Sequence, residues 1–253
     1  MIKTKTFSDE AEWLAFRINY IMASEISAIL GLNKYKSANQ YRKEKISSKQ
    51  DAVINPVNSR RGKILEPAVI EALRHDLGWH IMPNGRRIYH DDTLMYGCTP
   101  DAFLLTGTED ECFGDYMNKA VIECKTTTTQ SFERYWRGNK PLITQLVQTY
   151  VQMMLTEHET GYLAGMTIGE YEVEDSYNAV VDVKLAIYEI IRNKLLDDLI
   201  IEGIEKYNNH KTETRISILS SYSTKIESLL RSMTSLVGIY EGINNSDNPL
   251  TRG

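Results

Sequence analysis

The sequence has few cysteines and no long apolar run. Its 253 residues include only three cysteines, at positions 98, 112 and 124, and these form no CxxC pair. We therefore expect a reduced, cytoplasmic protein without a zinc or iron–sulfur site. No apolar stretch approaches the roughly 18 residues of a membrane span. The first residues also lack the apolar segment of a secretory signal, so the sequence predicts no membrane association.

The chain also lacks an excess of positive charge. It has 29 Lys and Arg against 34 Asp and Glu, for a net charge of -5. This balance argues against a protein that coats nucleic acid by bulk charge. It leaves room for a DNA enzyme with a local basic channel, because a metal site needs clustered acids. The length fits one large domain, or one domain with a helical appendage.

Helical and extended segments alternate along the chain. Caps and apolar spacing predict helices from about residue 8, over 22–31 with Ser24 as its N-cap, and over 37–45. A loop is expected at 47–59, then a helix over 62–77 that begins or bends near Glu66, because Pro67 follows. Short β-type runs occupy 79–126. A helix over 142–156 and a hairpin over 161–177 come next, and the chain looks helical from about 180 onward.

The segment VIECKT, residues 121–126, places charged groups inside an apolar strand. Because side chains alternate along a strand, Glu123 and Lys125 share one face and Cys124 lies on the other. A carboxylate can hold Mg²⁺, and a neighbouring Lys can polarise or deprotonate the attacking water. The main-chain carbonyl of Cys124 is a candidate for a further oxygen ligand. This pattern favours a metal-bound phosphate site.

Two more acids are expected near this strand. Asp101, in a Pro-Asp dipeptide, lies at the mouth of a neighbouring strand, so antiparallel pairing would bring it to Glu123 at one end of the sheet. On its helix, Glu66 shares a face with Val69 and Ile70, so it faces the core. A lone E-x-K motif or Pro-Asp turn is ordinary. The conjunction of these acids predicts a metal site with Glu66 as a third acid.

Gln145, Gln148 and Gln152 fall on one face of the helix predicted at 142–156. Such a stripe is either a solvated face or a face from which Gln148 reaches the site by hydrogen bonds to a ligand, water or phosphate.

Candidate phosphate-binding groups lie near the N-terminus. Ser24 is either a simple helix cap or, together with Arg17, a seat for a terminal phosphate at a helix N-terminus. Arg60 and Arg61 begin the basic cluster RRGK. They either lie on a solvated face or contact the DNA backbone.

The order of these motifs resembles a known family. The chain reads R-x6-S-x6-G, then G-x3-E-P, T-P-D and I-E-C-K, then a helix with Q-x2-Q and M-x-x-T. This order is similar to the phage lambda exonuclease and YqaJ-type viral recombinase family of the PD-(D/E)xK nuclease superfamily, over about residues 13–165. Three features depart from the family: Gln145 stands where a Tyr is frequent, the spacer between Asp101 and Glu123 is long, and the tail after about 180 matches nothing.

The resemblance implies an α/β (α+β) fold with a restriction-endonuclease-like core, in which helices flank a central mixed β-sheet. Residues 1–178 would form the nuclease core, and 179–253 a helical extension that packs on the core or on neighbouring subunits. It implies Mg²⁺, or Mn²⁺, with two ions per site. The ligands would be Asp101, Glu123, the Cys124 carbonyl and, through water, Glu66. Lys125 would activate the water, and Gln148 would support the site.

The resemblance also implies a substrate and partners. The enzyme would digest double-stranded DNA from 5′ ends, with Arg17 and Ser24 holding the 5′ phosphate, and would leave 3′ single strands for an annealing recombinase. It would be phage- or prophage-encoded in a bacterial host, and would assemble as a ring-shaped homo-oligomer such as a trimer.

Other functions remain open on these residues. A site-specific or structure-specific endonuclease would use the same core, and a non-catalytic protein that binds DNA ends would keep the fold. A nuclease with a four-cysteine iron–sulfur cluster is disfavoured by the cysteine count. A purely structural helical protein does not explain why Asp101, Glu123 and Lys125 all fall on β-type segments.

Overall fold

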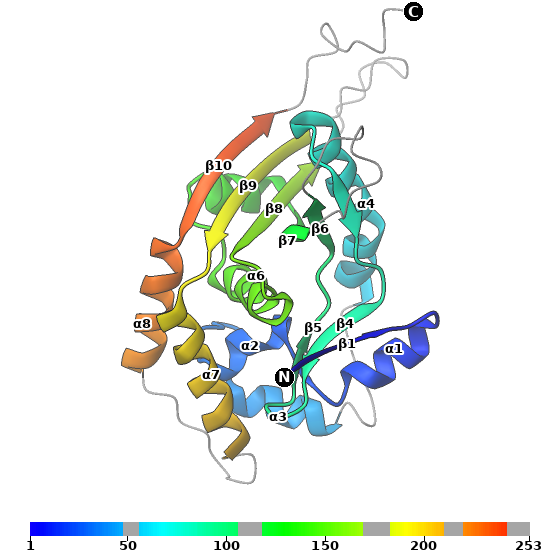
Figure 1. The fold of residues 1–253 in the computed structure, drawn as a ribbon. Helices are drawn as coiled ribbons and strands as arrows, with labels where there is room; N and C mark the ends of the chain where they lie inside the picture. Colours follow the sequence, from blue (N-terminus) through cyan, green and yellow to red (C-terminus); the bar gives the residue numbers. More distant parts are fainter. Residues whose placement is uncertain (48–55, 106–117, 169–182, 210–219, 242–253) are drawn as a thin grey trace, which may run out of the picture.

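The computed structural model describes residues 1–47, 56–105, 118–168, 183–209 and 220–241. Within these ranges the chain forms two sheets with helices packed against them, which confirms the predicted mixed α/β architecture (Figure 1). None of the described helices combines the length and the apolar character that a membrane crossing requires.

The larger sheet has six strands in the order β10-β9-β8-β7-β6-β3. Its central pair, β7 and β8, is parallel, and every other neighbouring pair is antiparallel. Both faces of its centre are buried, so β7 and β8 carry apolar side chains in both directions. The strands are β3 (Ile81–Pro83), β6 (Ala102–Leu105), β7 (Asn118–Thr127), β8 (Thr160–Ile168), β9 (Val183–Ile191) and β10 (Thr234–Glu241).

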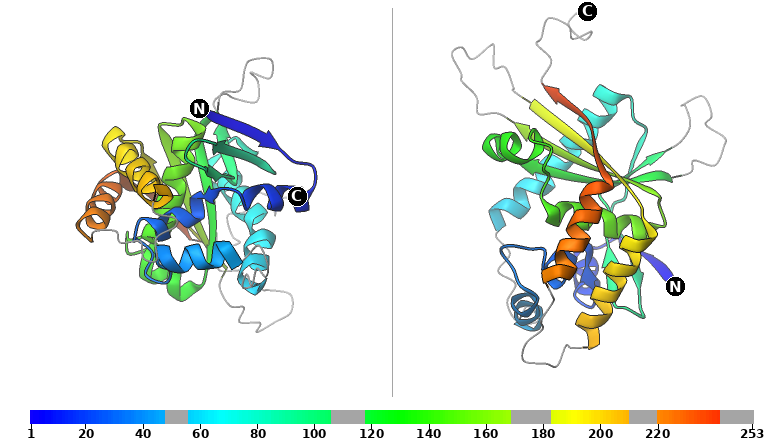
Figure 2. Two further views of the ribbon diagram at one scale, coloured as in Figure 1. Left: turned by 90° about the horizontal axis from the view of Figure 1, so that it is seen from below. Right: turned by 90° about the vertical axis from the view of Figure 1, so that its left-hand side faces the viewer.

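The smaller sheet has four strands in the order β1-β4-β5-β2 and lies beside the N-terminal helices (Figures 1 and 2). Three of its strands are antiparallel neighbours, and β2 is parallel to β5. Its strands are β1 (Ile2–Thr6), β2 (Ile21–Met22), β4 (Arg87–Asp91) and β5 (Tyr96–Cys98).

The helices cover the larger sheet from two sides. Helix α6 packs on the face of β7 that bears Val121, whereas α4 packs on the face that bears Ile122 and Cys124. Two apolar clusters therefore share one strand. The helices are α1 (Glu10–Arg17), α2 (Ala23–Ile29), α3 (Ala38–Ser47), α4 (Pro56–Leu77), α5 (Thr129–Ser131), α6 (Ile143–Thr156), α7 (Lys194–Asn209) and α8 (Ser220–Ser232), with the π-helix η2 (Phe132–Trp136).

The π-helix and strand β8 fit together at one glycine. Trp136, which is 1% exposed, packs against Gly165 so closely that a Cβ there would lie 2.2 Å from the indole ring. Only a residue without a side chain leaves room for the ring. Tyr188 of β9 also donates its hydroxyl hydrogen to the Trp136 carbonyl, so the segment after β7 is held against the sheet.

Several predicted elements need correction. The prediction of helix from about 180 onward is wrong for 183–191 and 234–241, which are β9 and β10. Helix α4 begins at Pro56, so residues 56–59 are not loop, and Pro67 lies inside the helix instead of near its start. The N-cap of α2 is Met22, not Ser24. The second arm of the hairpin predicted at 161–177 lies in 169–182, outside the described residues, and the first is β8.

Candidate active site

The pairing of β6 with β7 brings Asp101 to Glu123. The two strands are antiparallel with Ala102 opposite Ile122. Asp101, which immediately precedes β6, therefore lies beside Glu123 of β7. Its Oδ2 accepts a hydrogen bond from the Cys124 backbone N–H over 2.7 Å. The expectation that the two acids meet at one end of an antiparallel pair is confirmed.

Glu123 is the most buried charged group of the site, with 1% of its surface exposed. Its Oε1 accepts hydrogen bonds from Lys125 Nζ and, over 2.5 Å, from Gln148 Nε2. Its Oε2 accepts one from Gln152 Nε2, also over 2.5 Å. Hence a Lys two residues along the same strand and two amides from α6 hold both oxygens of this carboxylate. A buried carboxylate of this kind needs such partners.

Gln152 was missed as a candidate, although it lies four residues after Gln148 on the same helix face. The usable signal was the step of four, which places both amides above the same strand. Gln145 belongs to the same stripe and is half-buried.

Like charges gather around Asp101. Burial raises its pKa well above the usual range, and the carboxylates of Glu123 and Glu66 raise it further, while Lys125 opposes them. Burial lowers the pKa of Lys125, but Glu123 and Asp101 outweigh it, so the net pKa is raised. The ammonium form of Lys125 is therefore favoured at neutral pH. Ionisation of the Asp101 carboxyl is disfavoured by its surroundings.

Glu66 joins this group from the opposite side of the sheet. It lies on α4 and is half-buried, one turn before Val69 and Ile70, which pack on β7. Burial and the charges of Asp101 and Glu123 raise the pKa of the Cys124 thiol, and the charge of Glu66 raises it further. The structure thus gathers acids from α4, β6 and β7 around one strand position.

The donor set suits a small hard cation. Among the described residues, no three His, Cys, Asp or Glu side chains form a ready-made metal cage. Mg²⁺ does not need one, since it commonly binds one or two protein carboxylates and fills its shell with water and substrate phosphate. Asp101 and Glu123 provide these carboxylates, and the repulsion that raises the pKa of Asp101 would be relieved by a cation. The residues present therefore fit a divalent ion.

Arg17 lies at the edge of this acidic site. Its guanidinium stacks on the Trp13 ring, 4.4 Å from the ring centre. Burial lowers its pKa, and the charges of Glu25, Glu123 and Asp101 oppose that shift. Arg17 is thus a partly desolvated cation facing the carboxylates, an arrangement that suits a phosphate.

The other predicted phosphate-binding residues are less well placed. Ser24 is exposed in the first turn of α2. Arg60 and Arg61 lie in the first turns of α4, and their side chains fall outside the described part of the chain. Their contribution to DNA binding stays a prediction.

Comparison with known proteins agrees with the geometry. The family profile described as "YqaJ-like viral recombinase domain" matches residues 12–162. No curated protein sequence matches the chain significantly.

Among solved structures, the fold is similar to an alkaline exonuclease from Laribacter hongkongensis. The TM-score is 0.56 at 20% identity, over 88% of this chain and 97% of that one. The same enzyme in complex with dAMP is similar with a TM-score of 0.54 at 17% identity, over 88% and 97% of the two chains.

Proposed function

The chain belongs to the family of YqaJ-like viral recombinase domains, and we propose that it is a Mg²⁺-dependent exonuclease that digests double-stranded DNA from 5′ ends. Membership of this family and the fold shared with an alkaline exonuclease both support a deoxyribonuclease. The observation that carries the proposal is the juxtaposition of Asp101, Glu123 and Lys125 where β6 and β7 pair, because these groups suit phosphodiester hydrolysis.

Asp101, Glu123 and the Cys124 carbonyl would hold the metal, with Glu66 acting through water. Two Mg²⁺ ions, or Mn²⁺ in their place, would polarise the scissile phosphate and lower the pKa of the attacking water. Glu123 is fixed in place by Gln148 and Gln152, so its oxygens are preorganised. Ordering of these metal ligands on substrate binding would therefore cost little free energy.

Lys125 would assist the attacking water. Its raised pKa favours the ammonium form, which can orient a water and offset negative charge on the phosphate oxygens. Of the two roles expected for this residue, polarisation therefore fits this charge state better than proton abstraction.

Arg17 would determine which end is attacked. Its guanidinium, partly desolvated beside the carboxylates, would bind a terminal 5′ phosphate together with Ser24. Arg60 and Arg61 would follow the DNA backbone. A strand anchored at its 5′ end would present its first phosphodiester bonds to Glu123.

The product would be a 3′ single-stranded tail, passed to a single-strand annealing recombinase in a phage-type pathway inside a bacterial host. We propose a ring-shaped homo-oligomer, such as a trimer, as the working form. A ring would let a chain with a net charge of -5 enclose DNA within a locally basic channel.

Digestion of linear and circular duplexes tests the proposal. Linear DNA with a 5′ phosphate should be degraded in Mg²⁺ and spared in EDTA, and covalently closed circles should stay intact. Lys125→Ala should slow digestion by about 10²- to 10³-fold, the usual effect of removing one electrostatic stabilising group. Lys119→Ala, on the same strand but exposed, should have little effect.

Three results would contradict this function. Equal digestion of linear DNA by wild type and Lys125→Ala would remove the mechanism. Nicking of closed circles would instead favour an endonuclease. A Lys125→Ala variant that loses end binding as much as turnover would favour a non-catalytic DNA-end-binding protein.

A further inference from the structure

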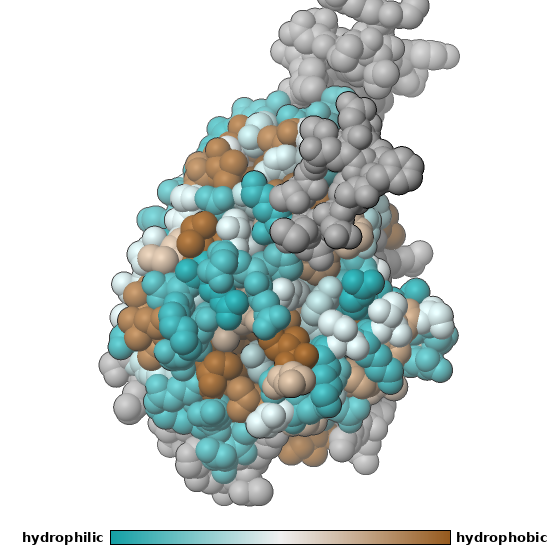
Figure 3. All heavy atoms as spheres, in the orientation of Figure 1, coloured by the Kyte–Doolittle hydropathy of each residue, from teal (hydrophilic) through white to brown (hydrophobic). Residues whose placement is uncertain are grey.

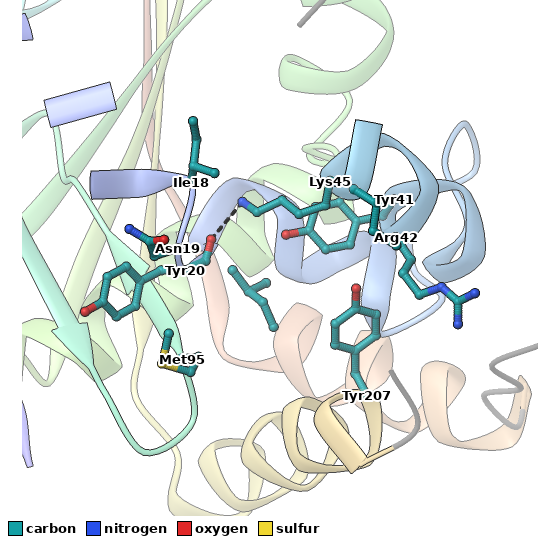
Figure 4. A pocket seen from close by; sticks show the side chains of 10 residues that line it. Ile18, Asn19, Tyr20, Tyr41, Arg42, Lys45, Met95 and Tyr207 are labelled. Atoms are coloured by element: carbon teal, nitrogen blue, oxygen red, sulfur yellow. Dashed lines mark hydrogen bonds between the residues drawn. The ribbon is translucent and has the colours of Figure 1, made fainter. Parts of the chain in front are cut away.

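A pocket of about 350 Å³ opens beside the segment that directly follows Arg17. It lies among the connection from α1 to β2, helix α3, the β4–β5 turn and the C-terminal part of α7 (Figure 4). Its volume falls in the range of small-molecule pockets. None of the functions assigned above uses it.

The pocket combines an apolar wall with a cationic rim. Ile18 and Ile46 are 41% and 65% exposed, unusually high for isoleucine. Arg42 supplies positive charge to the lining, whereas the Lys45 ammonium is paired with Glu25 over 3.2 Å; the described lining itself contains no carboxylate. Figure 4 shows Tyr207 on the wall opposite Met95. On a chain with a net charge of -5, such a lining suits a ligand with a flat apolar part and a negative charge.

The pocket is directly connected to the residue proposed to hold the DNA end. Ile18 follows Arg17 in sequence. The Lys45 Nζ donates hydrogen bonds to the Tyr20 carbonyl over 2.8 Å and to Glu25 Oε2 over 3.2 Å. Among the nearby charges, that of Glu25 does most to oppose the lowering of the Arg17 pKa by burial. Glu25 thus interacts both with Lys45 in the pocket and with Arg17. Phosphate binding at Arg17 and occupancy of the pocket would act on this shared carboxylate.

The wall of the pocket holds an unusual backbone. Met95 has a φ of 54°, in the left-handed region that favours glycine. Its carbonyl accepts a hydrogen bond from the Ile21 N–H over 2.8 Å, which ties the turn to β2. Residues held in such conformations often lie at binding sites. Figure 3 shows further apolar side chains on the molecule's face between α7 and the β1 end of the small sheet.

We propose that this pocket holds an unpaired nucleotide of a DNA end bound at Arg17. The inference rests on the proposed exonuclease function. Only one strand can enter the carboxylate site, so the terminal base pairs must separate, and a freed base loses its stacking partners. The apolar side chains of Ile18, Ile46 and Met95 would cover the base, and the Arg42 guanidinium in the lining would balance the charge of its phosphate.

Binding to blunt and frayed ends tests this proposal. Fluorescence anisotropy would compare a blunt duplex with duplexes that have two unpaired nucleotides on either strand, all in a Lys125→Ala background so that DNA is not consumed. Burial of the freed base against these apolar side chains should make a frayed end bind at least about fivefold tighter. The two frayed duplexes identify which strand supplies the nucleotide.

Ile46→Glu should abolish this advantage, because it places a carboxylate at the rim. Ile46 is exposed, so the fold should tolerate the change. Arg42→Gln provides a second variant. Arg231→Glu, in a similar cavity of about 340 Å³ near α8, is the matched control and should keep the advantage.

Equal affinity for blunt and frayed ends in the Lys125→Ala protein would overturn the pocket assignment. So would a fraying advantage that survives both Ile46→Glu and Arg42→Gln. Loss of all end binding in the starting protein would instead overturn the exonuclease function on which the assignment depends.

Discussion

The side-chain amide of Gln152 donates a hydrogen bond to Glu123 Oε2 over 2.5 Å, at a place where each residue is only 1% exposed. This bond fixes one oxygen of the carboxylate proposed to bind metal, while Gln148 and Lys125 occupy the other. Gln152 is therefore a positioning residue, buried behind the group it orients.

Gln152→Leu should lower nuclease activity by about 10- to 100-fold, because outer partners of metal ligands typically contribute that much. The Mg²⁺ concentration for half-maximal activity should rise as well, since Glu123 would no longer be held. Titration of activity against Mg²⁺, together with calorimetric Mg²⁺ binding, measures both effects. Gln145→Leu, on the same helix face but without a bond to Glu123, is the control. An equal loss in both variants would show that the effect comes from helix packing.

Arg17→Ala should reduce the preference for a 5′ phosphate over a 5′ hydroxyl. A charge-assisted hydrogen bond contributes about 1.5–3 kcal/mol, so the preference should fall by about one to two orders of magnitude. Initial rates on the two linear duplexes measure it, and Mg²⁺ affinity should be unchanged. Arg17→Lys should not rescue fully, because an ammonium does not stack on Trp13 as a guanidinium does. An unaltered preference would remove the role of Arg17.

Asp101→Asn should stabilise the protein in EDTA at neutral pH. Burial and nearby acids raise the pKa of Asp101 in the folded state, so folding favours its protonated form. Stability is then lost as the pH rises above about 4, where the carboxyl ionises in the unfolded chain. The melting temperature of Asp101→Asn should exceed that of wild type at pH 7 and approach it below pH 4. Added Mg²⁺ should raise only the wild-type value.

Asp92→Asn is the matched control of opposite sign. Hydrogen bonds from Lys3 and Tyr20 lower the pKa of Asp92, so its stabilising effect is present near neutral pH and is lost in acid. Asp92→Asn should therefore melt below wild type at pH 7. If both Asn variants shift the melting temperature in the same direction, the electrostatic account of Asp101 is wrong.

Gly165→Ala should destabilise the fold by about 1–3 kcal/mol, because the added methyl would overlap the buried Trp136 ring. Gly62→Ala is the comparison. A methyl group added at Gly62 in α4 would meet no described atom within 4 Å, so alanine should stabilise the protein by about 0.5–1 kcal/mol through helix propensity. Urea unfolding of both variants measures the difference. A mild effect of Gly165→Ala would mean that Trp136 can move aside.

The central site was predictable because its evidence is local. Strand alternation places Glu123 and Lys125 together from sequence alone, and the Pro-Asp dipeptide marks the start of β6. Helix α6 shows clear apolar spacing. Gln152 was overlooked because a buried amide in a Gln stripe looks like a solvated one until its partner strand is known.

The C-terminal strands were not predictable from periodicity. β9 is buried on both faces of the sheet, so its apolar residues run almost continuously and resemble a buried helix. β10 is a half-exposed edge strand with a bulge between Leu236 and Gly238, which disrupts alternation. The apolar stripe after 219 therefore joins a true helix, α8, to a strand. Tertiary pairing decides where the one ends and the other begins.

Because β7 is shared between two apolar clusters, the same strand register is needed for the candidate site and for a stable fold. A slip of one residue against β6 would turn Glu123 toward the cluster around Ile70 and Leu73, and would turn Cys124 toward the amides of α6. Such a chain would bury a carboxylate among aliphatic groups and leave two glutamines without their acceptor. Misregistered molecules would thus be unstable as well as inactive, so a cell's proteases could remove them before they compete for DNA ends.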